Sequence, residues 1–166
     1  QLSGFVDHST TGIIGADVLN NFNILIDVEA ERVSFLIDEI NLNGDILEID
    51  DFMGIPIILV KIAGTERRMF YDTGAQISYF QDEVLSIFPS AGTVTDFYPG
   101  VGQFQTETYI LDTTLGTKTH KLRSGSLPEL LGMTLMMAGT EGIIGNEILN
   151  NRVVGYFPKK KRLVLA

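Results

Sequence analysis

The sequence predicts an all-β protein with one or two short helices. The 166-residue chain contains 17 glycines, many of them beside β-branched residues, which is typical of short strands joined by tight turns. Hydrophobic residues make up 45% of the chain and charged residues 20%, as in globular rather than disordered proteins. Ten phenylalanines and five tyrosines are sufficient to fill the core of one modest domain.

The composition argues against several classes of function. A net charge of −9 does not suit nucleic-acid binding, which needs a basic face. The chain has no cysteine, and His8 and His120 are its only histidines, so neither a cysteine-based nor a histidine-rich metal site is expected. A Ser–His–Asp triad would lack its usual nucleophile-elbow motif. The most apolar run, residues 130–139, is far shorter than the roughly 20 residues of a membrane-spanning helix, and no compartment is indicated.

A ten-residue segment occurs twice in the chain. GIIGADVLNN at residues 12–21 returns as GIIGNEILNN at residues 142–151, with seven of the ten positions identical and an offset of 130 residues from Gly12 to Gly142. Two of the other three positions exchange Asp for Glu and Val for Ile. A near-match of this length indicates an internal repeat.

Each copy predicts the same local structure. An apolar strand ends at Ile14 or Ile144, and a glycine then turns the chain. A short helix over residues 18–21 or 148–151 follows, with acidic residues or Asn near its start, where a helix favours them. A hairpin closes each copy, formed by residues 23–28 and 32–37 in the first and by residues 152–157 and 162–166 in the second.

The segment between the two copies predicts mostly strands. Residues 38–51 are expected to form an acidic link with an Asn-Gly turn at positions 43–44. The expected elements after it are a hairpin of residues 54–62 and 65–71 around Ala63-Gly64, a short helix over 81–88, a long hairpin over 93–111 with FYPGVGQF at its tip, a strand over 118–123 and an apolar segment over 127–138 with room for a short helical turn.

One short motif suggests catalysis. The stretch MFYDTGAQISYF, residues 69–80, places Asp72 directly after three apolar or aromatic residues. Two carboxylates that share one proton can activate water, because like charges at hydrogen-bond distance do not both ionise. Such a site needs a rigid turn at a strand end, which the Thr73 hydroxyl can lock, and small neighbours, which Gly74 and Ala75 supply. The tripeptide alone is equally consistent with a turn that merely caps a hairpin.

Two further segments follow this motif. A glycine-bearing stretch, PGVGQF, occupies residues 99–104, and GIIGN occupies residues 142–146, about 70 residues after Asp72. With Phe70 and Tyr71 before the motif and Ser78 behind it, residues 54–166 resemble the aspartic peptidases in order, spacing and residue type. The resemblance is to the retropepsin-like branch found in viruses and bacteria, a closed β lobe in which two apolar residues and a glycine thread beside the Asp-Thr-Gly loop.

The resemblance implies a role for each motif residue in an aspartic-type endopeptidase. Asp72 would be a catalytic carboxylate, Thr73 would brace the loop, and Gly74 would lie close to the substrate or to a second loop. Residues 98–104 would form a flap that closes over an extended peptide, which binds as an added strand. The implied substrate-binding residues are Ala75, Tyr98, Gly100, Val101 and Gly102. Neither a metal nor a cofactor is implied.

The family needs two such aspartates, and this chain has one Asp-Thr-Gly. Asp112 does not fit, because in LDTTLG the glycine position is taken by Thr114. The first copy of the repeat resembles the end of a first lobe. Residues 1–50 are therefore expected to be the C-terminal remnant of such a lobe plus the acidic link, and residues 51–166 a complete lobe. On the offset of 130, the counterpart of Asp72 precedes Gln1.

Three arrangements stay open on the sequence, two of which supply a second carboxylate and one of which lacks it. The full protein is a two-lobed peptidase, or each lobe dimerises with another chain as retropepsins do, or the fold serves as a catalytically silent peptide-binding or scaffolding module. An intact Asp-Thr-Gly-Ala with a flap and a closing motif argues for the enzyme. This fragment alone is expected to be inactive or weak unless it dimerises.

Overall fold

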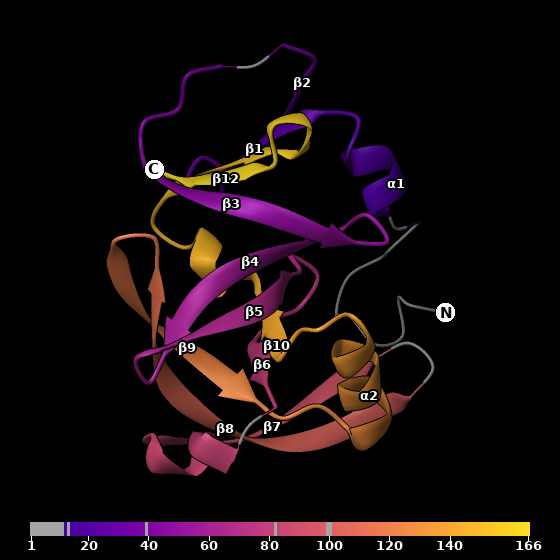
Figure 1. The fold of residues 1–166 in the computed structure, drawn as a ribbon, viewed down its shortest axis with the longest axis vertical. Coiled ribbons are helices and arrows are strands. Elements are labelled where there is room, and N and C mark those ends of the chain that lie inside the picture. The colour runs from indigo at the N-terminus through magenta and orange to yellow at the C-terminus, as the bar shows by residue number, and fades with distance from the viewer. Residues whose placement is uncertain (1–11, 13, 39, 82, 99–100) are drawn as a thin grey trace.

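The computed structural model describes residues 12, 14–38, 40–81, 83–98 and 101–166, and its main feature is one continuous sheet of twelve strands (Figure 1). The strand order is β2-β1-β11-β12-β3-β4-β5-β10-β6-β9-β8-β7, and an additional pairing joins β4 to β8. The strands are β1 (Asn23–Asp27), β2 (Arg32–Leu36), β3 (Asp45–Phe52), β4 (Ile55–Ile62), β5 (Thr65–Tyr71), β6 (Ser78–Phe80), β7 (Ser90–Tyr98), β8 (Gly102–Leu115), β9 (Lys118–Gly125), β10 (Gly142–Ile144), β11 (Val153–Phe157) and β12 (Arg162–Leu165). The predicted all-β class is confirmed.

Helices are short and few among the described residues. The α-helices are α1 (Ala16–Leu19) and α2 (Glu129–Met137), and the 3-10 turns are η2 (Glu83–Ile87), η3 (Asn146–Leu149) and η4 (Pro158–Lys160). The predicted helical turn in the apolar segment before β10 is therefore a nine-residue helix, α2. None of the described helices is long and apolar enough to cross a membrane.

The first part of the sheet, in the upper half of Figure 1, joins two hairpins edge to edge. β1 pairs with β2 on one side and with β11 on the other, and β12 pairs with β11 and with β3, all antiparallel. Asn20, just after α1, fastens this part to the rest of the chain. Its side-chain amide donates to the Gly54 carbonyl at 2.9 Å, and the Tyr156 hydroxyl donates to its Oδ1 at 2.5 Å.

The second part of the sheet surrounds the Asp-Thr-Gly motif. β4 and β5 form the predicted hairpin, in which Ala63 and Gly64 both adopt positive φ (51° and 79°), as a tight two-residue turn requires. β10 lies parallel to β5 and antiparallel to β6, and β6 lies parallel to β9. The long predicted hairpin is present as β7 and β8, which pair from Ser90↔Tyr109 to Tyr98↔Gly102.

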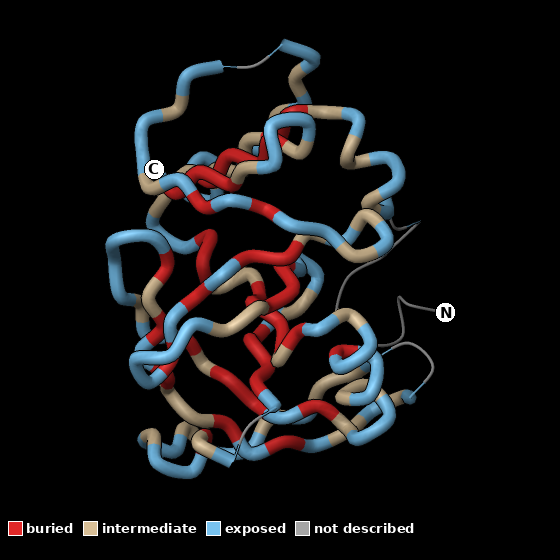
Figure 2. Tube along the Cα trace, in the orientation of Figure 1, coloured by how far each residue is buried: buried red, intermediate tan, exposed pale blue. Residues whose placement is uncertain are grey.

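The core consists of two clusters of buried side chains, which Figure 2 shows in red through the middle of the molecule. The larger cluster spans both parts of the sheet, from Ile24 in β1 to Phe80 in β6. The smaller cluster gathers around the end of β5, with β6, α2 and β10; its members are Ile57, Phe70, Ile77, Tyr79, Leu127, Leu135 and Ile143. Ala75 and Phe104 pack against it, so the smaller cluster joins the motif loop to the β7–β8 hairpin.

Two local predictions need correction. Both short helices of the repeat begin two residues earlier than expected, at Ala16 and Asn146, because the glycine that precedes each is already the N-cap. The acidic link is half strand: β3 occupies Asp45–Phe52, with Leu47 and Ile49 buried on either side of the exposed Glu48. This alternation of buried and exposed positions has the period of a strand. β3 also runs across the expected domain boundary between residues 50 and 51.

Candidate active site

Asp72 lies at the point where a buried strand reaches the surface. The last three residues of β5, Met69, Phe70 and Tyr71, are buried, whereas Asp72, Thr73 and Gly74 are exposed and Ala75 is half-buried. The strand is held on both sides, by β4 and by β10. The carboxylate therefore stands on a rigid base and faces solvent.

Backbone hydrogen bonds set the shape of the loop that carries this carboxylate. The Asp72 N–H donates to the Ile144 carbonyl at 3.0 Å, which continues the parallel pairing of β5 and β10 by one residue. The Gly74 N–H donates to Asp72 Oδ1 at 2.8 Å, and the Ala75 N–H donates to the Asp72 carbonyl at 3.2 Å. One carboxylate oxygen is thus oriented by the loop's own backbone, as an Asx turn does.

Thr73, the predicted brace of the loop, lies on its solvent-facing side. Thr73 is exposed, and its hydroxyl forms no hydrogen bond to any of the residues that the structure describes. Bracing inside the chain comes from Asp72 Oδ1 and the backbone instead. A contact of Thr73 with a counterpart loop stays a prediction.

GIIGN, the closing motif, passes directly behind the loop. The Gly145 N–H donates to Ser78 Oγ at 3.1 Å, and the Asn146 N–H donates to the Ala75 carbonyl at 2.9 Å. A Cβ atom on Gly145 would lie 2.4 Å from the Ile77 carbonyl oxygen, and one on Gly142 would lie 2.0 Å from the Tyr79 carbonyl oxygen. No side chain fits at either position, so these glycines are required by the close approach of two backbones.

The β7–β8 hairpin is the predicted flap. Tyr98 pairs with Gly102 at its end, and the Val101 N–H donates to the Tyr98 carbonyl at 3.1 Å. Tyr98 and Val101 are exposed, and Gly102 has a φ of +90°, which suits glycine. Gly100 lies outside the described residues. Of the predicted substrate-binding residues, the structure therefore places three at the hairpin tip and Ala75 in the loop of Asp72.

Sequence reasoning missed the residue that ties this hairpin to the sheet. Tyr79 in β6 is buried, its hydroxyl donates to the Asp96 carboxylate in β7, and its ring lies 6.2 Å from the Phe104 ring in β8. One side chain thus contacts both strands of the hairpin. Burial, and then the hydrogen bond to Asp96, raise the pKa of Tyr79, so the phenol stays protonated. A tyrosine seven residues after Asp72 carried no sequence signal for this contact.

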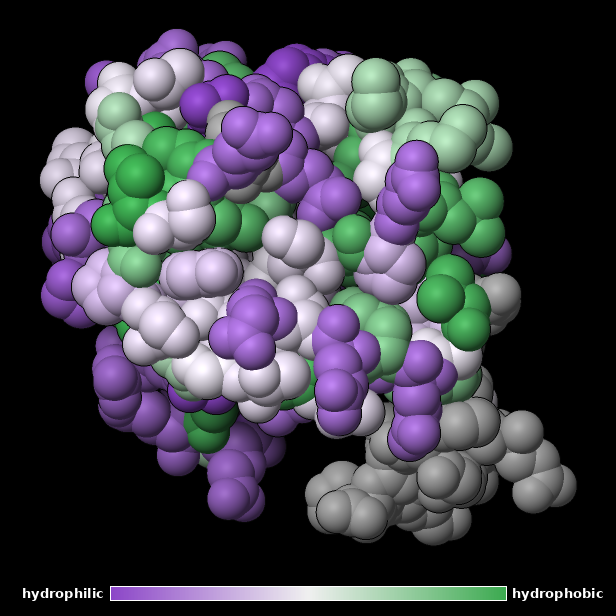
Figure 3. Space-filling model, turned by 90° about the horizontal axis from the view of Figure 1, so that it is seen from below, coloured by the Kyte–Doolittle hydropathy of each residue, from purple (hydrophilic) through white to green (hydrophobic). Residues whose placement is uncertain are grey.

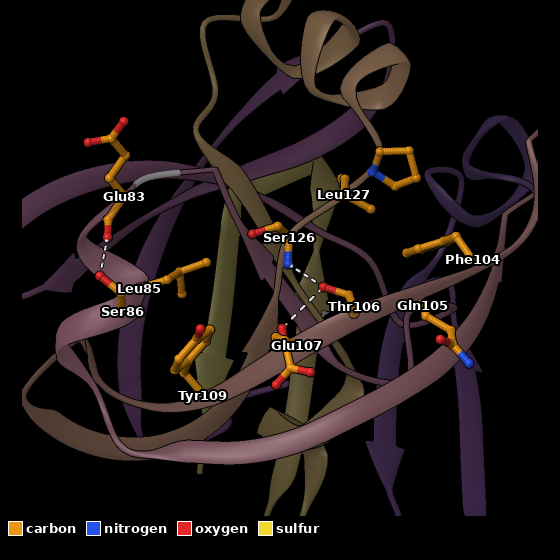
Figure 4. Close-up of a pocket in the computed structure, with 11 residues that line it drawn as sticks. Glu83, Leu85, Ser86, Phe104, Gln105, Thr106, Glu107, Tyr109, Ser126 and Leu127 are labelled. Carbon is orange, nitrogen blue, oxygen red and sulfur yellow. Dashed lines mark hydrogen bonds between the residues drawn. The ribbon is translucent and has the colours of Figure 1, made fainter.

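One hollow on the described surface lies away from the Asp-Thr-Gly motif. It measures about 590 Å³ and is bounded by β8, η2 and the residues before α2 (Figure 4). Its polar groups bond to one another: the Ser126 N–H donates to Thr106 Oγ1, whose hydroxyl donates to the Glu107 carbonyl. No residue of the Asp-Thr-Gly motif lines it. We assign no chemistry to this hollow, because the Ser126, Thr106 and Glu107 groups at its centre already bond to one another.

The end of the molecule formed by β7, β8 and α2 carries exposed apolar side chains. Figure 3 views this end and shows hydrophobic residues in green among hydrophilic ones. On α2 the exposed large apolar residues are Leu130, Met133, Met136 and Met137. Within the described ranges, no three His, Asp or Glu side chains lie together as metal ligands would.

Comparisons with known proteins agree with this geometry at the level of the fold. No protein-family model matches the sequence, and no curated protein is similar to it in sequence. A crystal structure of a retropepsin-like aspartic protease from Rickettsia conorii is similar over 74% of this chain and 89% of its own, with a TM-score of 0.50 and 16% identity. A solution structure of the Simian Foamy Virus (mac) protease matches 49% of this chain and 94% of its own, with a TM-score of 0.36 and 17% identity. The chain has a retropepsin-like fold.

Proposed function

We propose that the chain is one lobe of an aspartic endopeptidase in which Asp72 supplies one of two catalytic carboxylates. The observation that carries this proposal is the Asp72 loop: an exposed carboxylate at the end of a buried strand, with one oxygen oriented by the Gly74 N–H at 2.8 Å. A positioned carboxylate is what general acid–base chemistry on a peptide bond requires. The retropepsin-like fold supports the same reading.

In the proposed reaction, two carboxylates share one proton across the junction of two lobes. The ionised member takes a proton from water as the water oxygen attacks the peptide carbonyl carbon, and the protonated member donates to the carbonyl oxygen. Collapse of the tetrahedral intermediate then breaks the C–N bond. The carboxyl that took the proton from water donates it to the leaving nitrogen, and the other carboxylate takes a proton from one hydroxyl of the intermediate, which restores the starting pair. The two carboxylates titrate as a pair, so neither role is assigned to Asp72 alone.

The peptide would lie between the Asp72 loop and the β7–β8 hairpin. Gly74 and Ala75 leave the approach to the carboxylate open on one side, and Tyr98, Val101 and Gly102 would cover the peptide from the other. Unpaired backbone groups at the hairpin would bind an extended peptide as an added strand. Closure of the hairpin would exclude water from the reacting bond.

Substitution of Asp72 tests the proposal. In the full-length protein, Asp72→Asn should lower the rate of peptide cleavage by at least about a thousandfold, because one carboxylate of the pair is lost. The matched control is Asp112→Asn: Asp112 is an exposed aspartate followed by Thr, paired with Lys121 at 2.8 Å. The control should cleave at the wild-type rate.

Cleavage unchanged by Asp72→Asn would refute the catalytic assignment. The measurement is turnover of a peptide library between acidic and neutral pH, with peptide affinity measured on the same samples. Tight binding without turnover in the full-length protein would favour the alternative, a silent peptide-binding or scaffolding module. The 166-residue chain alone should show little or no turnover, because it carries a single Asp-Thr-Gly.

A further inference from the structure

The two copies of the repeated segment have opposite surroundings. Ile144 in the second copy is 1% exposed, whereas its counterpart Ile14 is 61% exposed. In the hairpins that follow, Leu163 is fully buried and its counterpart Val33 is 53% exposed. Ile148 is likewise buried and its counterpart Val18 exposed, and Leu165 is buried and its counterpart Phe35 exposed. Similar apolar residues are thus covered in one copy and open to solvent in the other.

The glycines differ in the same way. In the second copy, Gly142 and Gly145 are pressed against the backbone of the Asp72 loop and β6, which leaves no room for a Cβ atom. A Cβ atom on Gly12 would meet nothing within 4 Å among the described residues, and one on Gly15 would meet only the side chain of Asp17. Nothing in the described part of the chain requires glycine at these two positions. A backbone loop like that of Asp72 would require it.

The sheet relates the two copies by a local twofold arrangement. β1 and β11 pair antiparallel, and Leu25 lies opposite Gly155, which is its own counterpart at the offset of 130. β2 then flanks β1 as β12 flanks β11. On its far side β12 pairs with β3, from Arg162↔Glu48 to Leu165↔Asp45. The far side of β2 pairs with no strand among the described residues.

We propose that β2 (residues 32–36) and the segment around α1 (residues 12 and 14–19) form the docking surface for a second β lobe that precedes residue 12 in the same polypeptide. This lobe would add an antiparallel strand to the free edge of β2, as β3 does at β12. It would also place an Asp-bearing loop against Gly12, Ile14 and Gly15. This inference rests on the proposed function, for which it names the partner that supplies the second carboxylate.

A second copy of this chain does not fit the surface. The occupant must lack a closing hairpin of its own, because β1 and β2 already fill that place beside β11. Every copy of this chain carries its own closing hairpin, β11 and β12. Moreover, β11 has β1 on one edge and β12 on the other, so no edge of β11 remains for the closing strand of another subunit.

The segment that bears this surface is itself firmly attached. Asn20 bonds both to Gly54 and to Tyr156, and Ile24 and Asn23 of β1 are buried. The first-copy helix and hairpin therefore have a defined place on the second-copy lobe. The occupant would meet a preformed surface rather than one that orders on binding.

Amide hydrogen exchange tests the docking surface without relying on catalysis. In the 166-residue chain, the β2 amides that do not bond to β1 should exchange freely. In the full-length gene product they should exchange at least about a hundredfold more slowly, because a new strand protects them. Equal exchange in the two proteins, or a gene product with no β lobe before residue 12, would overturn the proposal.

A matched pair of variants tests the apolar part of the surface. Val18→Asp should lower the melting temperature of the full-length protein but change that of the 166-residue chain little, since Val18 is exposed there. The control is Ile87→Asp in η2, which is exposed and lies outside the surface. The control should change neither protein. A Val18→Asp effect equal in both proteins would contradict the assignment.

Sedimentation distinguishes a lobe of the same polypeptide from a second copy of this chain as the partner. The 166-residue chain should be a monomer, and a dimer in which the β2 amides become protected would overturn the proposal in favour of a second copy. The outcome is distinct from failure of the proposed function. If the β2 amides are protected in a full-length protein that cleaves no peptide, the docking surface is supported and the proposed enzymatic function is refuted. If Asp72→Asn abolishes cleavage but the β2 amides are unprotected, the enzymatic function is supported and the docking surface is refuted.

Discussion

At the scale of single residues, the candidate site depends on contacts that hold two groups in place. The Gly74 N–H orients Asp72, and the buried Tyr79 hydroxyl bonds to Asp96 on the β7–β8 hairpin. A hydrogen bond to a charged acceptor contributes more to stability than a neutral one, and leaving a half-buried carboxylate without its donor is costly. Tyr79 is thus placed to control where the hairpin rests above the sheet.

Removal of the Tyr79 hydroxyl tests this contact. Tyr79→Phe keeps the ring beside Phe104 and deletes only the donor to Asp96. We expect the free energy of unfolding to fall by about 1–3 kcal/mol, measured by denaturant titration. In the active full-length protein we expect KM to rise more than kcat falls, because the hairpin closes over the peptide less well. An unchanged midpoint and unchanged KM would show that the contact carries neither role.

At the scale of elements, the closing motif and the loop of Asp72 act as one unit. β10 lies parallel to β5, and its continuation bonds to Asp72, Ala75 and Ser78 through backbone or side-chain groups. In the first copy, a Cβ atom on Gly12 or Gly15 would meet no backbone atom of a described residue. The two copies therefore offer a controlled comparison within one chain.

The glycines at matched positions should respond differently to alanine. Gly142→Ala in the 166-residue chain would force a Cβ atom against the Tyr79 carbonyl, so the free energy of unfolding should fall by at least about 2 kcal/mol. Gly12→Ala should change it by less than about 0.5 kcal/mol, since a Cβ atom there meets no described neighbour. Thermal and denaturant unfolding of both variants provide the comparison. Equal effects would mean that the two copies have similar surroundings in solution.

At the scale of the whole molecule, three tyrosines make the free energy of unfolding depend on pH in the alkaline range. Burial is the main cause that raises the pKa values of Tyr71, Tyr79 and Tyr156, the last to about 12. A phenol whose pKa is higher in the folded state stabilises the fold at pH values below the unfolded pKa of about 10. That contribution is lost as the pH rises through the folded pKa.

The free energy of unfolding should therefore decrease above about pH 10. Denaturant titrations at pH 8, 9, 10 and 11 measure the slope. Tyr156→Phe removes one of the three phenols and should make the slope shallower, even though the loss of its bond to Asn20 lowers stability at every pH. A slope that is identical in wild type and Tyr156→Phe would contradict the assignment of a raised pKa to Tyr156.

The sequence by itself determined the parts of the protein whose signal is local. Turn glycines and alternating strands predicted the β class and the hairpins, and the Asp-Thr-Gly and GIIGN motifs identified the loop and the segment behind it. Strand β3 was missed because its acidic residues resembled a solvated link, although its alternation of buried and exposed positions is that of a strand. These features depend on residue type and short-range period, which a sequence displays directly.

Only the tertiary structure decided which distant residues meet. The contact of Tyr79 with Asp96 and Phe104, the backbone approach that makes Gly142 and Gly145 necessary, and the unequal burial of the two repeat copies all depend on strand order and register. Strand order is set by pairing between segments far apart in the chain, and no local pattern encodes it. For that reason the sequence was sufficient to single out Asp72 as a candidate, and the strand order was needed to propose where a second lobe would dock.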